Sequence, residues 1–313
     1  MQAIRIALIG GGIWGSKILR DLRGLGATVA VFDPDPAREL ELLAGGAQRV
    51  STGLPTDATA WDGFIVASPS TTHRAVLEAI LPLGVPVFVE KPLTTNYADA
   101  LALQAIVHER VFLMHVWRYH AGVLALAEIA RSGELGEVLG LRTTRANWTS
   151  PRRDTDSLWN LAPHDLTIAL AILGHLPKPR AAVLEEHEGT VRGGVLLLGQ
   201  SPYAVFEVSN RYERKEREVR LHCQEGVAVL RNERVDYVSI YRGDAHQPAA
   251  VLTEERRPFS GPSPLQAELA EFLEYLAGGP PPRCDFAEGL AVVRALHEME
   301  QLGRAATKPS ANG

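Results

Sequence analysis

Three closely spaced glycines are the first residues in this sequence whose types and spacing could do chemistry. Gly10, Gly12 and Gly15 follow an apolar, strand-like segment in a G-x-G-x-x-G arrangement and precede a helix-like one. In such a turn the first glycine makes the bend, the second admits a pyrophosphate, and the third lets the helix pack on the strand. The N–H groups at the helix start, from Ile13 and Trp14 onward, would hold the anion.

An acidic residue at the expected distance favours a dinucleotide site over an ordinary glycine-rich surface turn. Asp33 ends the second predicted strand, about 20 residues past the glycines, where a carboxylate accepts ribose hydroxyls. Its charge would repel a 2′-phosphate, and no arginine follows directly to offset it. We therefore expect NAD as cofactor. Arg38 is close enough in sequence to keep NADP as the alternative.

Two further strands end in polar residues. The carboxyl ends of parallel strands share one edge of a sheet, where such sheets bind ligands, so these residues are candidates for the same crevice. Thr71 or Thr72 could equally serve only as a cap for the next helix. The candidates are Ser68, Pro69, His73, Glu90 and Lys91.

The first third of the chain alternates strand and helix patterns at βαβ spacing, which predicts a doubly wound parallel sheet. We assign residues 1–120 to a dinucleotide-binding domain of this kind. The predicted strands are 4–9, 28–32, 63–67, 85–89 and 111–116, and the predicted helices are 13–22, 37–44, 72–81 and 97–109.

The pattern changes after residue 120, where several apolar or alternating runs follow one another without helices between them. Residues 121–306 therefore read as an α+β domain with a large, open, mainly antiparallel sheet, and residues 307–313 as a flexible tail. The segment 243–264 is predicted to be a loop. Helices are expected at 123–131, 161–173, 265–276 and 286–302, and strands at 138–147, 181–185, 194–198, 204–209, 218–222, 227–230 and 235–241.

Composition limits the possible partners. The chain has 313 residues, of which 46% are hydrophobic, and a net charge of −5 gives no general attraction for nucleic acid or anionic membranes. The first strand begins at once, leaving no room for a signal peptide. Two cysteines, Cys223 and Cys284, suit a reducing cytoplasm and are too few for a zinc site, so we expect a cytoplasmic protein without metal.

Five motifs in order resemble the glucose-fructose oxidoreductase and inositol dehydrogenase family. They are the glycine turn, the turn 67–73, Glu90-Lys91-Pro92, the segment 115–119 and a later helix carrying His164. The resemblance implies a Rossmann domain and a substrate domain whose sheet mediates homodimers or homotetramers. It also implies NAD(P)-dependent hydride transfer at a secondary carbinol carbon of a sugar or cyclitol. The sequence around His164 is similar to that of family members that act on nucleotide-linked sugars.

In that family pattern the lysine of Glu-Lys-Pro and a histidine of the second domain are catalytic, which implies these roles for Lys91 and His164. An aspartate is common at the position occupied here by Asn160, four residues before His164 and on the same helical face. An amide can neither ionise nor take a proton, so Asn160 is a departure. It is either part of an adapted site or merely a helix N-cap.

Further residues could contact the cofactor or an anionic substrate. Arg118 could hold the carboxamide region or the substrate, with help from Tyr119, unless it forms a salt bridge between the domains. Arg142 and Arg145 belong to a basic stretch that is either an anion site or only a solvated loop. The substrate candidates in that stretch are Trp148, Arg152 and Arg153.

Two alternatives stay open at this point. Asn160 could mark a non-catalytic, NAD-binding sensor or regulatory protein of the same fold. The same fold could also serve a reductase of a non-sugar substrate, such as an imine or a tetrapyrrole. His115, His120 and Asp165 are interpreted as bystanders or helpers.

Overall fold

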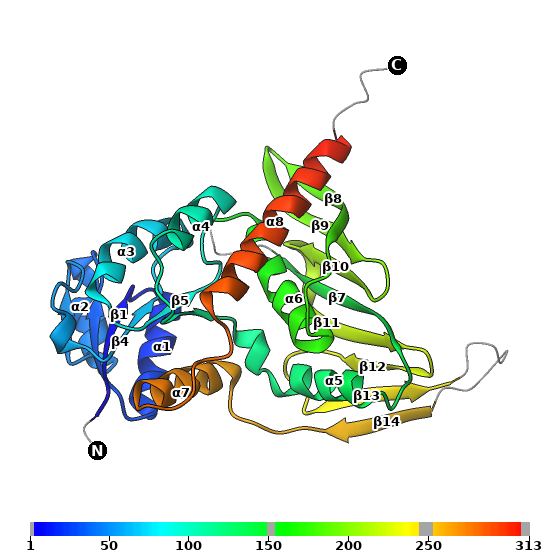
Figure 1. The fold of residues 1–313 in the computed structure, drawn as a ribbon, viewed down its shortest axis with the longest axis horizontal. Helices are drawn as coiled ribbons and strands as arrows, with labels where there is room; N and C mark the ends of the chain where they lie inside the picture. The colour runs from blue at the N-terminus through cyan, green and yellow to red at the C-terminus, as the bar shows by residue number, and fades with distance from the viewer. Residues whose placement is uncertain (1–2, 149–153, 244–252, 308–313) are drawn as a thin grey trace. The chain divides into compact units, whose positions relative to one another are not determined.

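The structure is a computed structural model that describes residues 3–148, 154–243 and 253–307. The chain forms two compact units, each with its own sheet (Figure 1). The first comprises Met1–Val116 and Pro262–Val293, and the second comprises Trp117–Gly261 and Arg294–Gly313.

The first unit contains a 6-stranded parallel sheet of order β3-β2-β1-β4-β5-β6. The strand order reverses between β1 and β4, which is the position where doubly wound sheets bind ligands at the carboxyl ends of the strands. The predicted Rossmann arrangement is confirmed. Its strands are β1 (Arg5–Ile9), β2 (Thr28–Phe32), β3 (Arg49–Ser51), β4 (Gly63–Val66), β5 (Val87–Glu90) and β6 (Val111–Met114).

The helices that follow the strands belong to this unit, and so does α7, a helix from late in the chain. Helix α7 packs against α1. The ring of Phe272 in α7 lies 4.9 Å from that of Phe88 in β5, so α7 completes the core of this unit. The helices are α1 (Ile13–Gly24), α2 (Glu39–Ala44), α3 (His73–Ile80), α4 (Tyr97–Gln104), α7 (Pro264–Leu276) and the start of α8 (Phe286–Thr307), with 3₁₀ turns at Pro36–Arg38, Ala58–Ala60, Ser70–Thr72 and Leu81–Leu83.

Two predictions for this unit were wrong in detail. The helix expected at 97–109 ends at Gln104, where i→i−3 bonds tighten the backbone: the N–H of Ala105 donates to Ala102 and that of Ile106 to Leu103. Strand β3 was missed because it has three residues and none of them is buried, so no apolar run marks it.

The second unit contains an 8-stranded sheet of order β14-β13-β12-β11-β7-β10-β9-β8. Only the described pair β7 and β10 runs parallel, which confirms the mainly antiparallel sheet. Its strands are β7 (Val138–Trp148), β8 (Pro179–His187), β9 (Thr190–Gly199), β10 (Tyr203–Ser209), β11 (Arg211–Cys223), β12 (Gly226–Leu230), β13 (Tyr237–Arg242) and β14 (Thr253–Pro258).

Strand β14 corrects the loop predicted at 243–264. Its sequence is charged and lacks apolar alternation, so it gave no strand signal, yet it pairs along β13 with Ser239 opposite Arg256. At such an edge, backbone hydrogen bonds and charged side chains suffice to form a strand. Residues 244–252 of the same segment lie outside the described part of the chain.

Helices α5 (Ala121–Ser132) and α6 (Ser157–Leu173) pack against this sheet, and a 3₁₀ turn, Val116–Tyr119, precedes α5 (Figure 1). The end of α8 belongs to the same unit, where the Glu300 carboxylate accepts the indole N–H of Trp159 at 3.1 Å. Across the described ranges, no helix is long and apolar enough to cross a membrane.

A buried ion pair holds α6 to β7. The Arg145 guanidinium is 3% exposed, donates to Asp165 at 2.9 Å and lies 4.4 Å from the centre of the Trp117 ring. Burial raises the pKa of the Asp165 carboxyl, and the charge of Arg145 opposes that rise. The pair therefore fixes α6 as long as both partners are present.

We expect Arg145→Leu and Asp165→Leu each to lower the free energy of unfolding by about 3–5 kcal/mol, because either change leaves one buried charge without its counter-ion. The double variant should lose much less than the sum. Arg131→Ala, which removes an exposed pair with Glu128, is the control and should cost under about 1 kcal/mol. Denaturant unfolding measures all four, and additive losses in the double variant would contradict this account.

Candidate functional site

The three glycines of the turn differ in how closely their surroundings approach them. Gly10 has a φ of +99°, and a Cβ on it would lie 2.6 Å from the backbone of Ala67. A Cβ on Gly15 would lie 2.0 Å from the carbonyl oxygen of Gly10, whereas one on Gly12 would meet no described atom within 4 Å. The first and third glycines are therefore required for packing, and the second leaves open space where a ligand can approach.

The start of α1 is suited to an anion. Gly12 is its N-cap and gives the helix no side-chain cap, and the first turn contains no acidic residue. Ile13 and Trp14 are 79% and 37% exposed, and the ammonium of Lys17 lies 5.1 Å from the Trp14 ring centre. Open N–H groups, a helix dipole and a nearby cation all favour a phosphate at this end of the helix.

Asp33 is tied to the glycine turn. One carboxylate oxygen accepts the N–H of Gly11 at 2.6 Å, and the other accepts the N–H of Asp35 at 3.0 Å. Arg38, the residue that kept NADP open, pairs with Glu41 at 3.1 Å. The turn and the helix start supply N–H donors, and Asp33 supplies a carboxylate acceptor. Together these groups fit a dinucleotide.

Trp14 and Lys91, which are far apart in sequence, meet at Glu90. The Trp14 indole N–H donates to one carboxylate oxygen of Glu90, and the Lys91 backbone N–H donates to the other at 3.0 Å. Glu90 and Lys91 are each 8% exposed at the carboxyl end of β5. One carboxylate therefore connects the glycine turn to the Glu-Lys-Pro segment.

His73 is completely buried within the first unit. Its ring is fully buried, with Nδ1 2.9 Å from the carbonyl oxygen of Pro92 and Nε2 3.1 Å from that of Ser68. The Thr72 hydroxyl bonds Ser68 and the carbonyl of Pro69, which shapes the same turn. This geometry suits His73 to hold the turn at Ser68 and Pro69 in place against the Glu-Lys-Pro segment.

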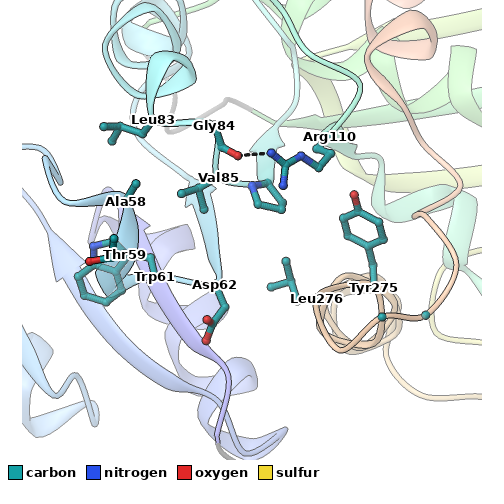
Figure 2. A pocket seen from close by; sticks show the side chains of 13 residues that line it. Ala58, Thr59, Trp61, Asp62, Leu83, Gly84, Val85, Arg110, Tyr275 and Leu276 are labelled. Atoms are coloured by element: carbon teal, nitrogen blue, oxygen red, sulfur yellow. Dashed lines mark hydrogen bonds between the residues drawn. The ribbon is translucent and has the colours of Figure 1, made fainter.

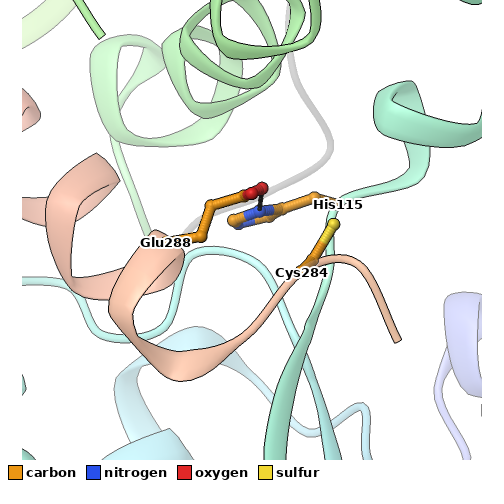
Figure 3. A group of neighbouring side chains, drawn as sticks. All are labelled: His115, Cys284 and Glu288. Atoms are coloured by element: carbon orange, nitrogen blue, oxygen red, sulfur yellow. Dashed lines mark hydrogen bonds and ion pairs between the residues drawn. The ribbon is translucent and has the colours of Figure 1, made fainter. Parts of the chain in front are cut away.

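Figure 3 shows a group that the sequence analysis did not find: His115, Cys284 and Glu288. Their nitrogen, sulfur and oxygen atoms lie within 4.8 Å of one another, and the three types can ligate a metal. The His115 Nδ1 is already 2.8 Å from a Glu288 carboxylate oxygen, so a hydrogen-bonded pair between the residue that follows β6 and α8 accounts for that contact. The two residues are 173 positions apart, too far for sequence reasoning to pair.

A pocket of about 570 Å³ lies at the opposite edge of the same sheet (Figure 2). Asp62 precedes β4 and Val85 precedes β5, so this pocket lies at the amino ends of the strands. Arg110 on its rim donates to the carbonyl of Gly84. Because doubly wound sheets bind their cofactors at the carboxyl ends, the pocket is separate from the dinucleotide site.

In the second unit, α6 presents one polar pair. Every residue from Ser157 to Ala169, all within the described part, is buried except Asn160 and His164, which are half-buried one turn apart. The helix begins four residues earlier than predicted, with the Asp156 carboxylate as N-cap on the N–H of Trp159. The interpretation of Asn160 as the N-cap was therefore wrong.

Aromatic and basic residues of this unit fall into different environments. Tyr119 is buried and Arg118 half-buried, and His120 stacks on Trp117 and caps α5 through its Nδ1. Burial lowers the pKa of His120, which keeps its ring neutral at ordinary pH.

The expected basic cluster before α6 was partly wrong. Arg142 is exposed while Arg145 is buried in its ion pair, because residues three apart on a strand point to opposite faces. Trp148 is 65% exposed at the end of β7. Arg152 and Arg153 lie outside the described residues.

Comparison with known proteins agrees with this geometry. Residues 4–116 match the model of the oxidoreductase family with an NAD-binding Rossmann fold. The glycine turn and strand order define this class of domain, so residues 4–116 are similar to that oxidoreductase family, as the motifs implied.

Particular relatives include an inositol 2-dehydrogenase of Leifsonia xyli, 32% identical over 164 residues, which are 50% of this chain and 48% of that protein. A UDP-N-acetylglucosamine 3-dehydrogenase of Acidithiobacillus ferrooxidans is 25% identical over 96% of this chain and 97% of its own. A solved structure of a protein of that name and organism superposes with a TM-score of 0.82 at 24% identity, covering 97% of this chain and 99% of that one. A 3-ketoreductase of Actinomadura kijaniata, solved with NADP, has a TM-score of 0.82 at 18% identity, covering 96% of this chain and 98% of that one.

Gly15→Ala tests the packing of the turn. A glycine-to-alanine change within a helix ordinarily adds up to about 1 kcal/mol of stability, but here the methyl group would overlap the Gly10 carbonyl. We expect a loss of about 1–3 kcal/mol in denaturant unfolding and a loss of NADH affinity. Gly24→Ala in the same helix, where a Cβ meets no described atom within 4 Å, is the control. Equal stability of the two variants would contradict the assignment.

Proposed function

We propose that this chain is an NAD-dependent oxidoreductase that transfers a hydride between nicotinamide and a secondary carbinol carbon of a sugar, cyclitol or nucleotide-linked sugar. The polar pair on α6, set in an otherwise buried stretch, is the observation that carries the catalytic part. The similarity to a UDP-N-acetylglucosamine 3-dehydrogenase along nearly the whole chain supports the substrate class. Nothing among the compared proteins favours a sensor or a reductase of a non-sugar.

We infer NAD in preference to NADP from two contacts. The Asp33 carboxylate is fixed beside the turn, where it can accept ribose hydroxyls and repel a 2′-phosphate. The nearby Arg38 guanidinium is engaged by Glu41. Residues 1–120 would bind the cofactor and residues 121–306 the substrate, while a content of two cysteines, Cys223 and Cys284, both buried, suits the cytoplasm.

The nicotinamide, when bound, supplies the hydride chemistry, and the chain's own residues handle orientation and protons. His164 would take the substrate hydroxyl proton on a ring nitrogen, since imidazole titrates in the range that proton transfer requires. Asn160, one turn earlier, would orient the hydroxyl by hydrogen bonding, because its amide cannot accept the proton.

Lys91 would stabilise the negative charge that develops on the substrate oxygen. Its backbone position is set by Glu90 at the end of β5, where ligands of such sheets bind. Ser68, Pro69 and Glu90 at neighbouring strand ends would line the cofactor side.

Recognition of the rest of the substrate would come from the second unit. Arg118 and Tyr119 precede α5, and Trp148 offers an exposed aromatic face on which a sugar or base can stack. Arginines at 152 and 153 would pair with carboxylate or phosphate, which makes an anionic, nucleotide-linked sugar the favoured substrate.

Lys91→Met and His164→Ala should lower turnover by about 10²-fold or more while NADH affinity stays close to that of the wild type. Turnover is measured as NADH formation with UDP-N-acetylhexosamines and inositols. Lys178→Met and His175→Ala, both at exposed positions of the second unit, are matched controls and should retain activity. Activity like that of the wild type in both Lys91→Met and His164→Ala would overturn these roles.

We also propose that the second-unit sheet mediates a homodimer or homotetramer. Its outward side chains include Val183, Val195 and Leu197, which are 69%, 48% and 38% exposed, and Val183 lies directly opposite Val195 in the β8–β9 pair. A row of exposed apolar side chains on a sheet is typical of a surface covered by another chain.

Val195→Arg should convert the oligomer to a monomer, because a charge in an apolar contact is not compensated. Light scattering after size exclusion gives the mass directly. Leu40→Arg, at an 82% exposed position of α2, is the control and should leave the mass unchanged. An unchanged mass for Val195→Arg, or a monomeric wild type, would contradict this surface as the interface.

A further inference from the structure

Glu268 is a carboxyl group in the interior of the first unit. It is 0% exposed and lies on the face of α7 that also carries Leu265, Leu269 and Phe272 into the core. Among the described residues, neither of its carboxyl oxygens has a hydrogen-bond partner. A charged carboxylate is very costly in such surroundings, so the charges around Glu268 must decide whether it is protonated.

Helix α7 brings Glu268 to the side of β5 that carries Glu90. The ring of Phe272, one turn after Glu268, lies 4.9 Å from that of Phe88, which is two residues before Glu90 and on the same face of the strand. The negative charges of Glu90 and of Glu271, from its own helix, both act on Glu268. Helix α1, which packs against α7, contributes the buried Asp21, and that carboxylate is paired with Arg20 at 2.8 Å. Burial, followed by these two negative charges, raises the pKa of Glu268 well above its usual value of 4.5. Of two carboxyls in such an environment, one stays protonated so that the other can ionise.

Glu90 is the member of this pair that makes hydrogen bonds as a carboxylate. Its two oxygens accept the Trp14 indole N–H and the Lys91 backbone N–H, and donors of this kind stabilise the ionised form. A second negative charge at Glu268 would repel Glu90 and strain both contacts. The neutral form of Glu268 is thus the one compatible with the observed geometry.

We propose that Glu268 is a positioning residue: as a neutral acid in the core it leaves Glu90 ionised and in place, and its ionisation would repel Glu90 and so displace the Trp14 turn and the Lys91 segment that receive the cofactor. Glu268 itself touches neither substrate nor cofactor. This inference rests on the proposed placement of NAD at the glycine turn.

The proposal predicts a pH dependence with a definite sign. A folded-state pKa above the ordinary value means that the stabilising contribution is complete below pH 4.5 and is lost as pH rises from there through the raised pKa. Folding stability should therefore fall across that interval, and cofactor affinity should fall as Glu268 ionises around its raised pKa. Replacing Glu268 by a residue that cannot ionise should remove this pH dependence.

The experiment compares the wild type with Glu268→Gln, Glu268→Leu and, as control, Glu274→Gln at an exposed position of the same helix. NADH affinity is measured by cofactor fluorescence at several pH values from 6 to 9, and thermal unfolding of the cofactor-free protein over the same range. Glu268→Gln should bind like the wild type where the wild-type Glu268 is neutral and better once that group ionises, with a flatter unfolding profile. Glu268→Leu, whose side chain also cannot ionise, should likewise lose the pH dependence of affinity and unfolding.

Parallel pH profiles for Glu268→Gln and the wild type, in both affinity and unfolding, would overturn the proposal. So would a wild-type pH dependence in Glu268→Leu. Should the leucine variant fail to fold, the comparison of the glutamine variant with the wild type decides alone. A wild type that binds neither NADH nor NADPH would instead overturn the proposed function, and its unfolding profile would still report the protonation of Glu268.

Discussion

The close contact between the carbonyl oxygen of Gly10 and the α carbon region of Gly15 is the constraint on which the dinucleotide domain depends. Only a residue without a side chain fits there, since a Cβ on Gly15 would be 2.0 Å from that oxygen. The contact places the start of α1 directly after β1, with open space at Gly12 between them. Asp33, bonded to Gly11, and Glu90, bonded to Trp14, then hold the turn from two sides.

The second unit holds its candidate functional residues in place by a buried helix and an ion pair. Helix α6 is buried along most of its length, and the ion pair of Arg145 with Asp165 fixes it to β7. Asn160 and His164 are the polar exception on that helix, so their position is determined by a rigid core rather than by a loop. Both units thus present their candidate functional groups from well-packed elements, as precise chemistry requires.

Local patterns were sufficient to predict much of this from sequence. The glycine spacing, the acidic end of β2 and the alternation of strands and helices identified the Rossmann domain, because each is a short-range signal. Strands β3 and β14 were missed because one is very short and the other is charged. The N-cap of α6 was misplaced because Asn160 directly precedes the stretch predicted as helix from residue 161, whereas Asp156 begins the helix one turn earlier and Pro163 lies inside it.

Contacts between residues far apart in the chain could not be predicted from the sequence. His115 and Glu288 pair across 173 positions, and the burial of Arg145 depends on which face of β7 covers the core. The burial of Glu268 follows from its face on α7, three residues after Leu265, but its closeness to Glu90 needs the fold.

The most direct test of the central claim is a crystal structure of the protein with NAD and a UDP-linked N-acetylhexosamine. The account predicts the pyrophosphate on the N–H groups at the start of α1, and the Lys91 Nζ and a ring nitrogen of His164 both within hydrogen-bonding distance of one sugar hydroxyl. A complex in which the amine and the imidazole open onto different cavities would contradict it.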